Sequence, residues 1–394
     1  MSPYLSAAEA AERLGVSRQT LYAYVSRGLL RAHDADDPRE RRYRRDEVER
    51  LATQRARGRK PKEVAKAALD WGTPVLESAI TLILGGRLYY RGEDATRLAE
   101  SASVEAVAAR LWQCPEDWAF GAEPPPLPAA YQALAPSYAG QGPQQALLPL
   151  FVVASGDDAT AVWQQDAQRQ AAGWGELLRV LFACLLGAPV SGAPLHAQCA
   201  AAWELDAAGA ALVRQALILC ADHELNASSF TARCVASTGA SLRAVLIAGL
   251  AALSGGRHGG MTARIEAFWD ELGDTAEPLS LLRRRLERGE KLPGFGHPLY
   301  PDGDVRAAQL LAGILPQRPH WQALVDAVEQ LTGQRPSIDF ALVVLRRHLC
   351  LPEGTAFGLF ACGRAIGWIA HALEQRADGQ LIRPRAAYVG PLPG

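Results

Sequence analysis

The sequence predicts a mainly helical protein in two parts, a small basic module followed by a much larger helical body. Apolar residues recur at helical spacing in runs such as "AALVRQALIL", which ends just before Cys220. The length of 394 residues exceeds what one ordinary core supports. Residues 1–60 hold 14 Lys and Arg against 9 Asp and Glu, a balance of +5, so with a whole-chain charge of −1 the remainder carries −6.

In the N-terminal module the sequence predicts two short helices joined by a tight turn. Ser6 followed by Glu9 is the pattern of a capping box before an apolar run. The turn at 14–17 contains a glycine and ends on a serine that can cap the second helix, "RQTLYAYVSRG". Leu21 and Val25, four residues apart, would face inward on that helix.

The outward face of the second helix carries polar side chains. In a helix-turn-helix the second helix enters the major groove of DNA and its early residues meet base edges. We therefore expect Arg18, Gln19 and Tyr22 to face the bases. Downstream, "RERRYRRDEV" places Tyr43 between arginines in a stretch suited to a short hairpin, and Asp46 with Glu49 would cap a third helix. The residues expected to meet DNA phosphates are Arg41, Arg42 and Arg44.

Residues 5–55 resemble the winged helix-turn-helix of the MerR and excisionase families. The segments that carry the resemblance are "LSAAEAAERLGVSRQTLYAYVSRGLL" and "RRYRRDEVERL". It implies DNA binding, while the alternative is a helical module reused for protein contacts, with solvated arginines. We expect this module to span residues 1–60, with a linker at 61–69 after the stretch "GRKPKE" at 58–63 and a second domain at 70–394.

The larger body places polar residues inside apolar sequence at several points. His223 lies in "CADHELNASSF", His258 in "SGGRHGGM" and His297 in "LPGFGHPLYPDGDVRA". Asp339 begins the apolar run of "RPSIDFALVVL", and Arg364 lies within "FACGRAIGWIAHALEQ". A buried polar group costs about 1–3 kcal/mol unless it is paired. Each of these residues also has a purely structural explanation as a turn, a helix cap or a core ion pair.

Several classes of function are excluded by what the sequence lacks. The three histidines lie 35 and 39 residues apart without an HExxH motif, so we expect no metal site. There is no GxSxG elbow and no GxxxxGK[ST] phosphate loop. The seven cysteines show no CxxC spacing, and no signal peptide is apparent, which favours reduced thiols in a cytoplasmic protein. The longest apolar runs are about half a membrane span.

Taken together and in this order, the motifs of the body resemble citrate synthase and its relative 2-methylcitrate synthase. The resemblance runs from about residue 70 to the end. It rests on "GGRLYYRGEDATRLAESASVEAVAARLW", "DHELNASSFTARCVAST", "GGRHGGM", "GFGHPLYPDGDVRA", "SIDFA", "GRAIGWIAHALEQ" and "LIRPRAAYVG". It implies a citrate synthase fold, a large helical domain with a smaller helical domain near 260–345.

The family resemblance also implies a reaction. Citrate synthases condense acetyl-CoA with oxaloacetate, a step of the tricarboxylic acid cycle in which an acyl group becomes an alkyl group on transfer; propionyl-CoA gives 2-methylcitrate. Asp339 matches the base that removes the methyl proton, and His258 the group that hydrogen-bonds the thioester oxygen. His297 matches the residue that polarises the ketone of oxaloacetate and protonates the new alkoxide. No cofactor is implied beyond the acyl-CoA substrate.

The substrate-binding residues follow from the same match. Arginine suits the two carboxylates of oxaloacetate because its planar fork pairs with a carboxylate bidentately. Arg306, Arg364 and Arg383 match the family's substrate arginines, with Arg385 nearby, and His223 matches a histidine that touches oxaloacetate. In the family the last arginine reaches into the partner's site, so a homodimer is implied.

The sequence departs from the family pattern at two positions and leaves a second function open. Arg257 replaces an apolar residue that often precedes the histidine of "RHGG", and Pro301 stands where relatives often carry a basic residue for the CoA phosphates. The alternative to an active synthase is a DNA-binding regulator that senses oxaloacetate, citrate or CoA esters. A sensor would need the substrate-binding arginines but would not need a catalytic base. The presence of Asp339 therefore favours an active enzyme.

Overall fold

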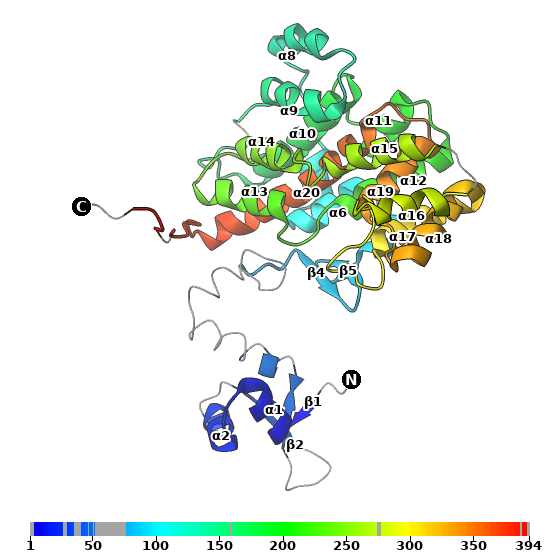
Figure 1. Cartoon of the computed structure of the whole chain (residues 1–394). Helices are drawn as coiled ribbons and strands as arrows, with labels where there is room; N and C mark the ends of the chain where they lie inside the picture. Colours follow the sequence, from blue (N-terminus) through cyan, green and yellow to red (C-terminus); the bar gives the residue numbers. More distant parts are fainter. Residues whose placement is uncertain are drawn as a thin grey trace. The chain divides into compact units, whose positions relative to one another are not determined.

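The computed structural model describes residues 4–26, 30–34, 41–45, 47–49, 51, 76–157, 160–273, 277–386 and 388–391. The chain divides into two compact units, Met1–Glu77 and Ser78–Gly394 (Figure 1). The predicted linker at 61–69, the "GRKPKE" stretch and the predicted start of the second domain at residue 70 lie outside the described residues.

The N-terminal unit combines two helices with a three-stranded antiparallel sheet. Its elements are β1 (Tyr4–Ser6), α1 (Ala7–Leu14), α2 (Arg18–Ser26), β2 (Ala32–Asp34) and β3 (Arg41–Arg44), followed by helical residues at 45, 47–49 and 51. The strand order is β1-β3-β2, so Tyr43 of β3 is paired with Leu5 on one side and Ala32 on the other. Tyr43 is buried in a small core with Leu14, Leu21 and Val48. This arrangement confirms the predicted helix-turn-helix with its hairpin.

The helix ends of this unit are formed as the sequence predicts. The Ser6 hydroxyl accepts the Glu9 amide at 3.3 Å while the Glu9 carboxylate accepts the Ser6 amide at 2.8 Å, which completes the capping box. Gly15 ends α1 with φ +59°, a left-handed conformation that favours glycine. Ser17 accepts the Thr20 amide at 3.2 Å and begins α2. Asp46, the other predicted cap, lies outside the described residues.

The larger unit begins with a small antiparallel sheet in the order β4-β5-β6 and continues as helices. The strands are β4 (Thr81–Leu84), β5 (Arg87–Tyr90) and β6 (Glu93–Asp94). The helices are α5 (Ala95–Ser101), α6 (Val104–Trp112), α7 (Glu116–Phe120), α8 (Ala129–Leu134), η1 (Ala135–Tyr138), α9 (Pro143–Ala154), α10 (Ala167–Leu186), α11 (Leu195–Ala202), α12 (Ala207–Cys220), α13 (Ala227–Ser237), α14 (Leu242–Leu253), α15 (Met261–Leu272), α16 (Leu279–Glu287), α17 (Val305–Ala312), η3 (Leu315–Gln317), α18 (Pro319–Thr332), α19 (Ile338–His348) and α20 (Thr355–Asp378).

Helix α20 is the central helix of the large unit. It lies against α12, α13, α14 and α19, and its residues from Thr355 to Ala372 are buried (Figure 1). Within the described residues it is the one helix long and apolar enough to cross a membrane, but 94% of its apolar stretch is buried in the protein. Two glycines permit this packing: a Cβ on Gly249 of α14 would overlap the Trp368 ring, and one on Gly367 would overlap the Asp222 carboxylate.

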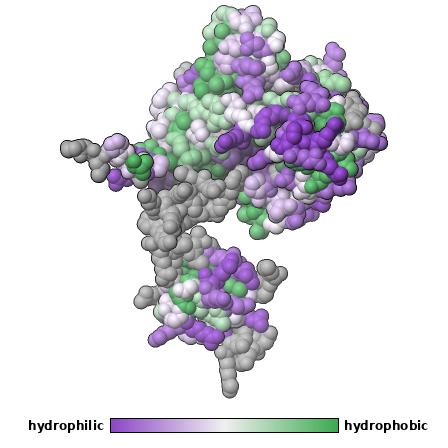
Figure 2. All heavy atoms as spheres, viewed as in Figure 1, coloured by the Kyte–Doolittle hydropathy of each residue, from purple (hydrophilic) through white to green (hydrophobic). Residues whose placement is uncertain are grey.

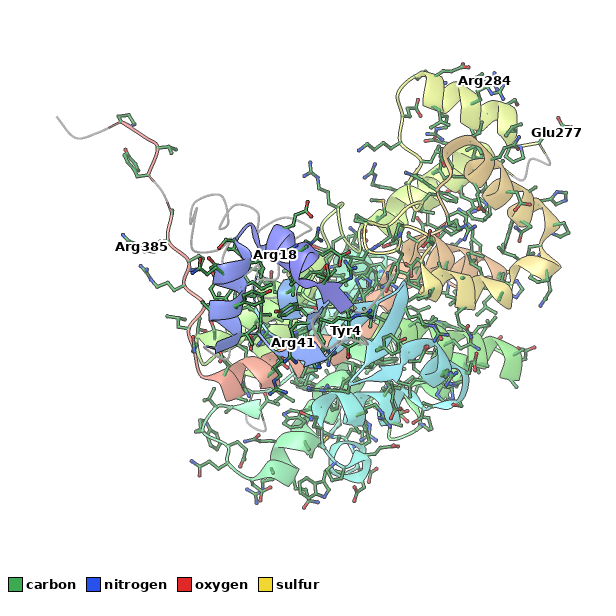
Figure 3. The ribbon with its side chains drawn as sticks, turned by 90° about the horizontal axis from the view of Figure 1, so that it is seen from below. Tyr4, Arg18, Arg41, Glu277, Arg284 and Arg385 are labelled. Atoms are coloured by element: carbon green, nitrogen blue, oxygen red, sulfur yellow. The ribbon has the colours of Figure 1, made fainter. Side chains whose placement is uncertain are left out.

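Helices α15 to α19 gather at one end of the large unit. Figure 3 shows them in yellow and orange as a lobe, with Arg284 of α16 on its outer side. These helices span residues 261–348; that they form a separate small subdomain, expected near 260–345, stays a prediction. In Figure 2 the surface over α16 is hydrophilic, consistent with the exposed Arg283 and Arg284 of this helix, whereas the surface around α14 is paler and more apolar.

Candidate active site

The predicted site residues come from the ends of several helices and from one helix interior. His223 follows α12, His258 lies in the turn between α14 and α15, and His297 lies in the loop before α17. Arg306 and Asp339 lie in the first turns of α17 and α19, whereas Arg364 lies inside α20. Helix ends bring polar groups into a helical core because the chain must turn there.

His223 and His297 lie beside each other. Their ring centroids are 5.1 Å apart at an interplanar angle of 86°. His223 is buried, and its Nε2 lies 3.0 Å from the Tyr300 hydroxyl. The Tyr300 ring is also 5.2 Å from that of His297. The "GFGHPLY" loop therefore folds back onto the turn that carries His223. Local sequence spacing does not reveal this contact, because the two histidines are 74 positions apart.

His258 is positioned by a hydrogen bond to Ser228. Its Nε2 lies 2.8 Å from the Ser228 hydroxyl, which also receives the Trp368 indole N–H at 3.1 Å. The Ser228 and Ser229 amides donate to the Asn226 side-chain oxygen at 3.1 Å, so Asn226 caps α13 and fixes Ser228. The ring of His258 meets Phe360 edge-on at 5.8 Å. These contacts fix the plane of the imidazole.

The loop before His297 depends on two glycines. Gly294 and Gly296 adopt φ +86° and +78°, the left-handed region. A Cβ on Gly294 would also lie 2.8 Å from Ile265. After this turn the Leu299 amide donates to His297 Nδ1 at 3.2 Å. In the neutral ring the proton is therefore on Nε2, which makes that nitrogen a hydrogen-bond donor.

Arg306 is bound to an acidic neighbour in the interior. Its Nε and one terminal nitrogen donate to the two oxygens of Asp304 at 2.9 and 2.8 Å, and both side chains are buried. Burial alone would raise the pKa of Asp304, but Arg306 outweighs it and the pKa lies below its ordinary value. Asp304 also accepts the Ile338 amide at 3.0 Å, which links α17 to the start of α19. The cation lies 5.4 Å above the Tyr300 ring.

Arg364 has spare hydrogen-bonding capacity. Its Nε donates to the Cys220 carbonyl at 2.8 Å, and its guanidinium lies 5.0 Å from the centre of the Phe360 ring. Among the described residues, one terminal nitrogen of this buried side chain has no hydrogen-bond partner. Burial lowers the pKa of Arg364, while the nearby Asp222 opposes that effect. A buried cationic N–H of this kind fits an incoming carboxylate.

Asp339 lies near both arginines. Burial raises the pKa of this carboxyl to about 6, against the opposing charges of Arg306 and Arg364. Burial lowers the pKa of His258 and of His297 to about 4, with Arg364 reinforcing it at His258 and Arg306 at His297. The site at pH 7 thus holds neutral imidazoles beside an ionised carboxylate whose pKa is close to the working pH.

Two of the predicted groups do not join this cluster within one chain. Arg383 and Arg385 are exposed on the segment after α20, which Figure 1 shows running away from the helical body. The Ile382 amide donates to Ser237 at 3.1 Å and fixes the beginning of that segment. A role for Arg383 in the partner's site stays a prediction.

The predicted DNA-contacting residues are exposed on the N-terminal unit. Arg18, Gln19 and Tyr22 lie on the outer face of α2, with Tyr22 51% exposed. Arg41, Arg42 and Arg44 are exposed on β3, and Figure 3 labels Arg18 and Arg41. Leu21 is buried and Val25 packs against the core, as expected for the inner face of α2.

Sequence reasoning missed the residues that hold the site together. Tyr300, Ser228, Trp368 and Asp304 were not predicted, although all lie inside the quoted motifs. Tyr300 follows His297 by three residues, and Asp304 precedes Arg306 by two, but neither spacing alone predicts a contact.

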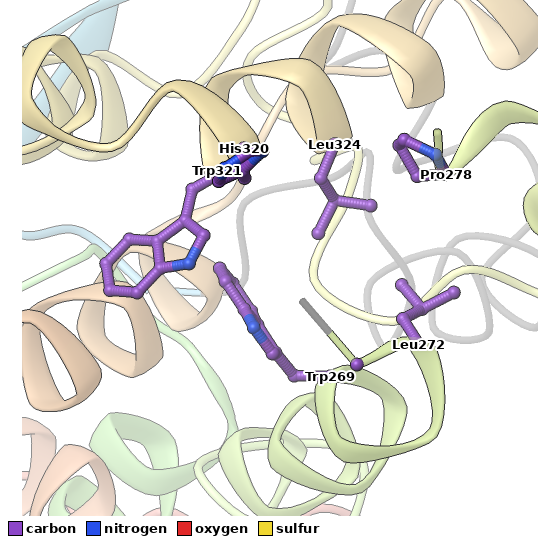
Figure 4. Close-up of a pocket in the computed structure, with 7 residues that line it drawn as sticks. Trp269, Leu272, Pro278, His320, Trp321 and Leu324 are labelled. Atoms are coloured by element: carbon purple, nitrogen blue, oxygen red, sulfur yellow. The ribbon is translucent and has the colours of Figure 1, made fainter. Parts of the chain in front are cut away.

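A pocket lies at the far end of α15 from His258. Trp269, Leu272, Pro278, His320 and Leu324 line it with Trp321, as Figure 4 shows. None of the predicted site residues lines this pocket. Within the described part of the chain, no group of three or more His, Cys, Asp or Glu side chains is arranged to hold a metal ion.

Comparisons with known proteins agree with this arrangement. The family model described as "Citrate synthase, C-terminal domain" matches residues 158–385, more than half of the chain, and one described as "Helix-turn-helix domain" matches residues 4–56. Citrate synthase 2 of Bacillus subtilis is 36% identical over 186 residues, covering 45% of this chain and 50% of that protein. The 2-methylcitrate synthase of Shewanella oneidensis is 35% identical over 187 residues, with the same shares covered. The chain spans about half the length of the curated relatives it matches.

Solved structures extend the likeness over more of the chain. The crystal structure of citrate synthase from Thermotoga maritima covers 82% of this chain and 95% of its own, with a TM-score of 0.65 and 25% identity. The fold predicted from the motifs is thereby confirmed.

Proposed function

Because this chain belongs to the citrate synthase family, we propose that it condenses acetyl-CoA or propionyl-CoA with oxaloacetate to give citrate or 2-methylcitrate and CoA. The observation that carries the proposal is the convergence of Asp339, His258 and His297 around Arg306 and Arg364. Each of these groups has the protonation state that the reaction needs at pH 7.

Oxaloacetate would be bound by its carboxylates. Arg364 offers a buried terminal nitrogen that no described residue satisfies, and the Asp304 pair holds Arg306 in a fixed orientation. A prearranged cation loses little freedom when the ligand arrives, so its contact contributes more to binding. His223, whose ring lies 5.1 Å from that of His297, would complete this part of the site.

The acyl-CoA would be activated between Asp339 and His258. Asp339 removes a proton from the methyl or methylene carbon next to the thioester, and His258 stabilises the enol oxygen by a hydrogen bond. The Ser228 hydroxyl lies 2.8 Å from both His258 Nε2 and the Asn226 side-chain oxygen, and it receives the Trp368 N–H at 3.1 Å. Because Ser228 engages Nε2, Nδ1 is the His258 nitrogen that would face the thioester and, when it carries the ring proton, donate to the enol oxygen.

The new carbon–carbon bond forms at the ketone of oxaloacetate. His297 Nε2–H polarises the ketone oxygen and gives its proton to the alkoxide that forms, because Leu299 holds Nδ1 as an acceptor. Water then cleaves the thioester, releasing CoA. Movement of the α15–α19 lobe toward the rest of the unit would expel other water and strengthen the charged contacts. Family membership carries no requirement for a cofactor beyond the two substrates.

The protein would act as a homodimer in which Arg383 completes the partner's site. In its own chain Arg383 is exposed. Leu381, Tyr388 and Val389 on the same segment are 57%, 73% and 90% exposed, a set of apolar side chains that a second copy would cover. The paler surface around α14 in Figure 2 offers a further apolar face for such contact.

The N-terminal unit would bind DNA separately from the chemistry. Its helix-turn-helix match and the exposed Arg18, Gln19 and Tyr22 on α2 support this proposal. A dimer presents two copies, which favours a palindromic target.

The experiment that tests the reaction is thiol release from acetyl-CoA and from propionyl-CoA, each with and without oxaloacetate. We expect release that requires oxaloacetate, and the ratio of kcat/KM values assigns the acyl group. Arg364→Leu should weaken oxaloacetate binding about tenfold or more, since charge-assisted contacts contribute about 1.5–3 kcal/mol. Oxaloacetate binding without thiol release, together with ligand-dependent DNA binding, would instead support the sensor.

A further inference from the structure

We propose that Asp222 is a positioning residue of the oxaloacetate site, and that Thr81 and Tyr90 of the β4–β5 hairpin hold it in place. The proposal rests on the function proposed above. The β4–β5 hairpin, which begins the large unit, would then position the substrate-binding residues, although none of its own residues is expected to touch substrate.

First, the β4–β5 hairpin contacts Asp222 through two of its side chains. The Thr81 hydroxyl donates to Asp222 Oδ2 at 2.6 Å. The Tyr90 hydroxyl lies among the carbonyls of Ile218, Leu219 and Asp222, at 3.0, 3.3 and 3.2 Å. The Asp222 amide donates back to the Tyr90 hydroxyl at 3.3 Å. Thr81 and Tyr90 are directly opposite each other in the β4–β5 pairing. One cross-strand pair therefore holds both the side chain and the main chain of Asp222.

The second observation is the place of Asp222 between two site residues. It immediately precedes His223, and Arg364 donates to the Cys220 carbonyl two residues earlier. The carboxylate is fully buried, and His371 Nε2 lies 3.2 Å from Oδ1. A rotation of this turn would move His223 and the carbonyl that orients Arg364 together.

The third observation concerns the facing side of α20. Arg364, Gly367 and His371 are spaced three and four residues apart, which places them on one face of the helix. That face lies against residues 220–222, because a Cβ on Gly367 would overlap both the Ala221 carbonyl and the Asp222 carboxylate. The absent side chain lets a buried anion sit close to the substrate-binding arginine.

The physical role follows from the charges. A buried guanidinium is costly without a counter-charge, and Asp222 supplies one while the site is empty. The Cys220 carbonyl in the same turn holds Arg364 Nε, so the position of the turn sets where the remaining Arg364 N–H groups point. Thr81 fixes the Asp222 carboxylate, and with it the turn, because it donates to the second carboxylate oxygen. Loss of the Thr81 hydroxyl should therefore affect oxaloacetate and leave the acyl-CoA contacts unchanged.

The test compares Thr81→Val with Thr81→Ser. Valine matches the shape of threonine without its hydroxyl, whereas serine keeps the hydroxyl. We expect Thr81→Val to raise both the KM and the calorimetric Kd for oxaloacetate about tenfold, because His223 and Arg364 would no longer be held in the binding position; tenfold corresponds to about 1.4 kcal/mol of binding free energy. The KM for acyl-CoA should change by less than about twofold. Thr81→Ser should bind oxaloacetate with an affinity close to that of the wild type. Asp222→Asn should lose more oxaloacetate affinity than Thr81→Val does.

The control is Thr238→Val, which removes a threonine hydroxyl that donates to the Val235 carbonyl at 2.7 Å outside the site. It should leave both KM values unchanged. Oxaloacetate constants within about twofold of wild type in Thr81→Val, with binding lost in Arg364→Leu, would overturn the role of Asp222 and leave the proposed function standing. Unchanged oxaloacetate binding in Arg364→Leu would overturn the proposed site itself. If Asp222→Asn does not fold, the comparison of Thr81→Val with Thr81→Ser still tests the role of Asp222.

Discussion

At the scale of single residues, opposing effects determine the protonation of Asp339. Burial raises the pKa of its carboxyl, while Arg306 and Arg364 draw it down, and the balance at about 6 leaves a base ionised at pH 7 but basic enough to take a proton. A fully solvated aspartate would be a weaker base, and an unopposed buried one would stay protonated.

The first prediction concerns catalysis by this carboxylate. Asp339→Asn should lower kcat by roughly 10²- to 10⁴-fold, because the amide has the shape of the base without its proton affinity. Oxaloacetate affinity, measured by calorimetry, should stay near the wild-type value. A variant that keeps near wild-type turnover would remove Asp339 from the mechanism.

The second prediction is that the same substitution stabilises the protein. The pKa is 3.8 in the reference state and about 6 in the folded state, so the folded protein loses about 3 kcal/mol of stability as pH rises from about 4 to about 6, and the loss is complete above that range. Asparagine avoids this loss. Asp339→Asn should therefore raise the denaturation midpoint more at pH 8 than at pH 5. The wild-type protein, unfolded at the same two pH values, is the reference.

Much of the residue-scale site follows from motifs, and the rest requires the fold. His223, His258, His297 and Asp339 stand out in the sequence because they interrupt apolar runs. Their supporting partners do not, since the Tyr300 and Thr81 contacts join segments 77 and 141 residues apart. Nothing in local spacing indicates which hydroxyl will meet which imidazole or carboxylate.

At the scale of elements, the N-terminal unit shows how capping and turn chemistry specify a module. Ser6, Glu9 and Gly15 determine where α1 begins and ends, and their roles were readable from sequence because caps act over three or four residues. The strand pairing of β1 with β3 was not predicted. That pairing joins Leu5 to Tyr43 over 38 residues, and only the packed core brings these strands together.

The third prediction separates two elements of this unit. Replacing Arg41, Arg42 and Arg44 of β3 with alanine should weaken binding to all DNA sequences and flatten the dependence of affinity on salt. Changing Arg18 or Gln19 of α2 should mainly alter sequence preference. Selection of genomic fragments on the purified protein, with and without oxaloacetate and acetyl-CoA, measures both the overall DNA affinity and the sequence preference of each variant. Failure to enrich any fragment would favour a protein-contact role.

At the scale of the whole molecule, the site is expected to be shared between two chains. The fourth prediction tests this by mixing Asp339→Asn and Arg383→Leu proteins, each nearly inactive alone. A mixed dimer has one site with both wild-type groups, so subunit exchange should restore about a quarter of wild-type activity. Mixing two batches of either single variant is the control. No recovery after exchange, verified by native mass spectrometry, would place Arg383 in its own chain's site or outside the mechanism.

The large-unit fold was predictable at this scale mainly through the ordered motifs. Composition and helical spacing indicate many helices, but they do not say that α20 lies among α12, α13, α14 and α19. That arrangement depends on close approach at Gly249 and Gly367, which a sequence shows only as two small residues.

The central position of α20 has a consequence for how the protein opens. A helix enclosed on all sides exposes its amide protons only when the surrounding helices separate, so its hydrogen exchange should report global unfolding. Arg364 lies in the middle of this helix. A bound dianion would then slow exchange to the same extent along the buried part of the helix, residues 355–372, because it lowers the population of the unfolded molecule and leaves local fluctuation unchanged. Substrate affinity could be read from the slowest-exchanging amides of the core.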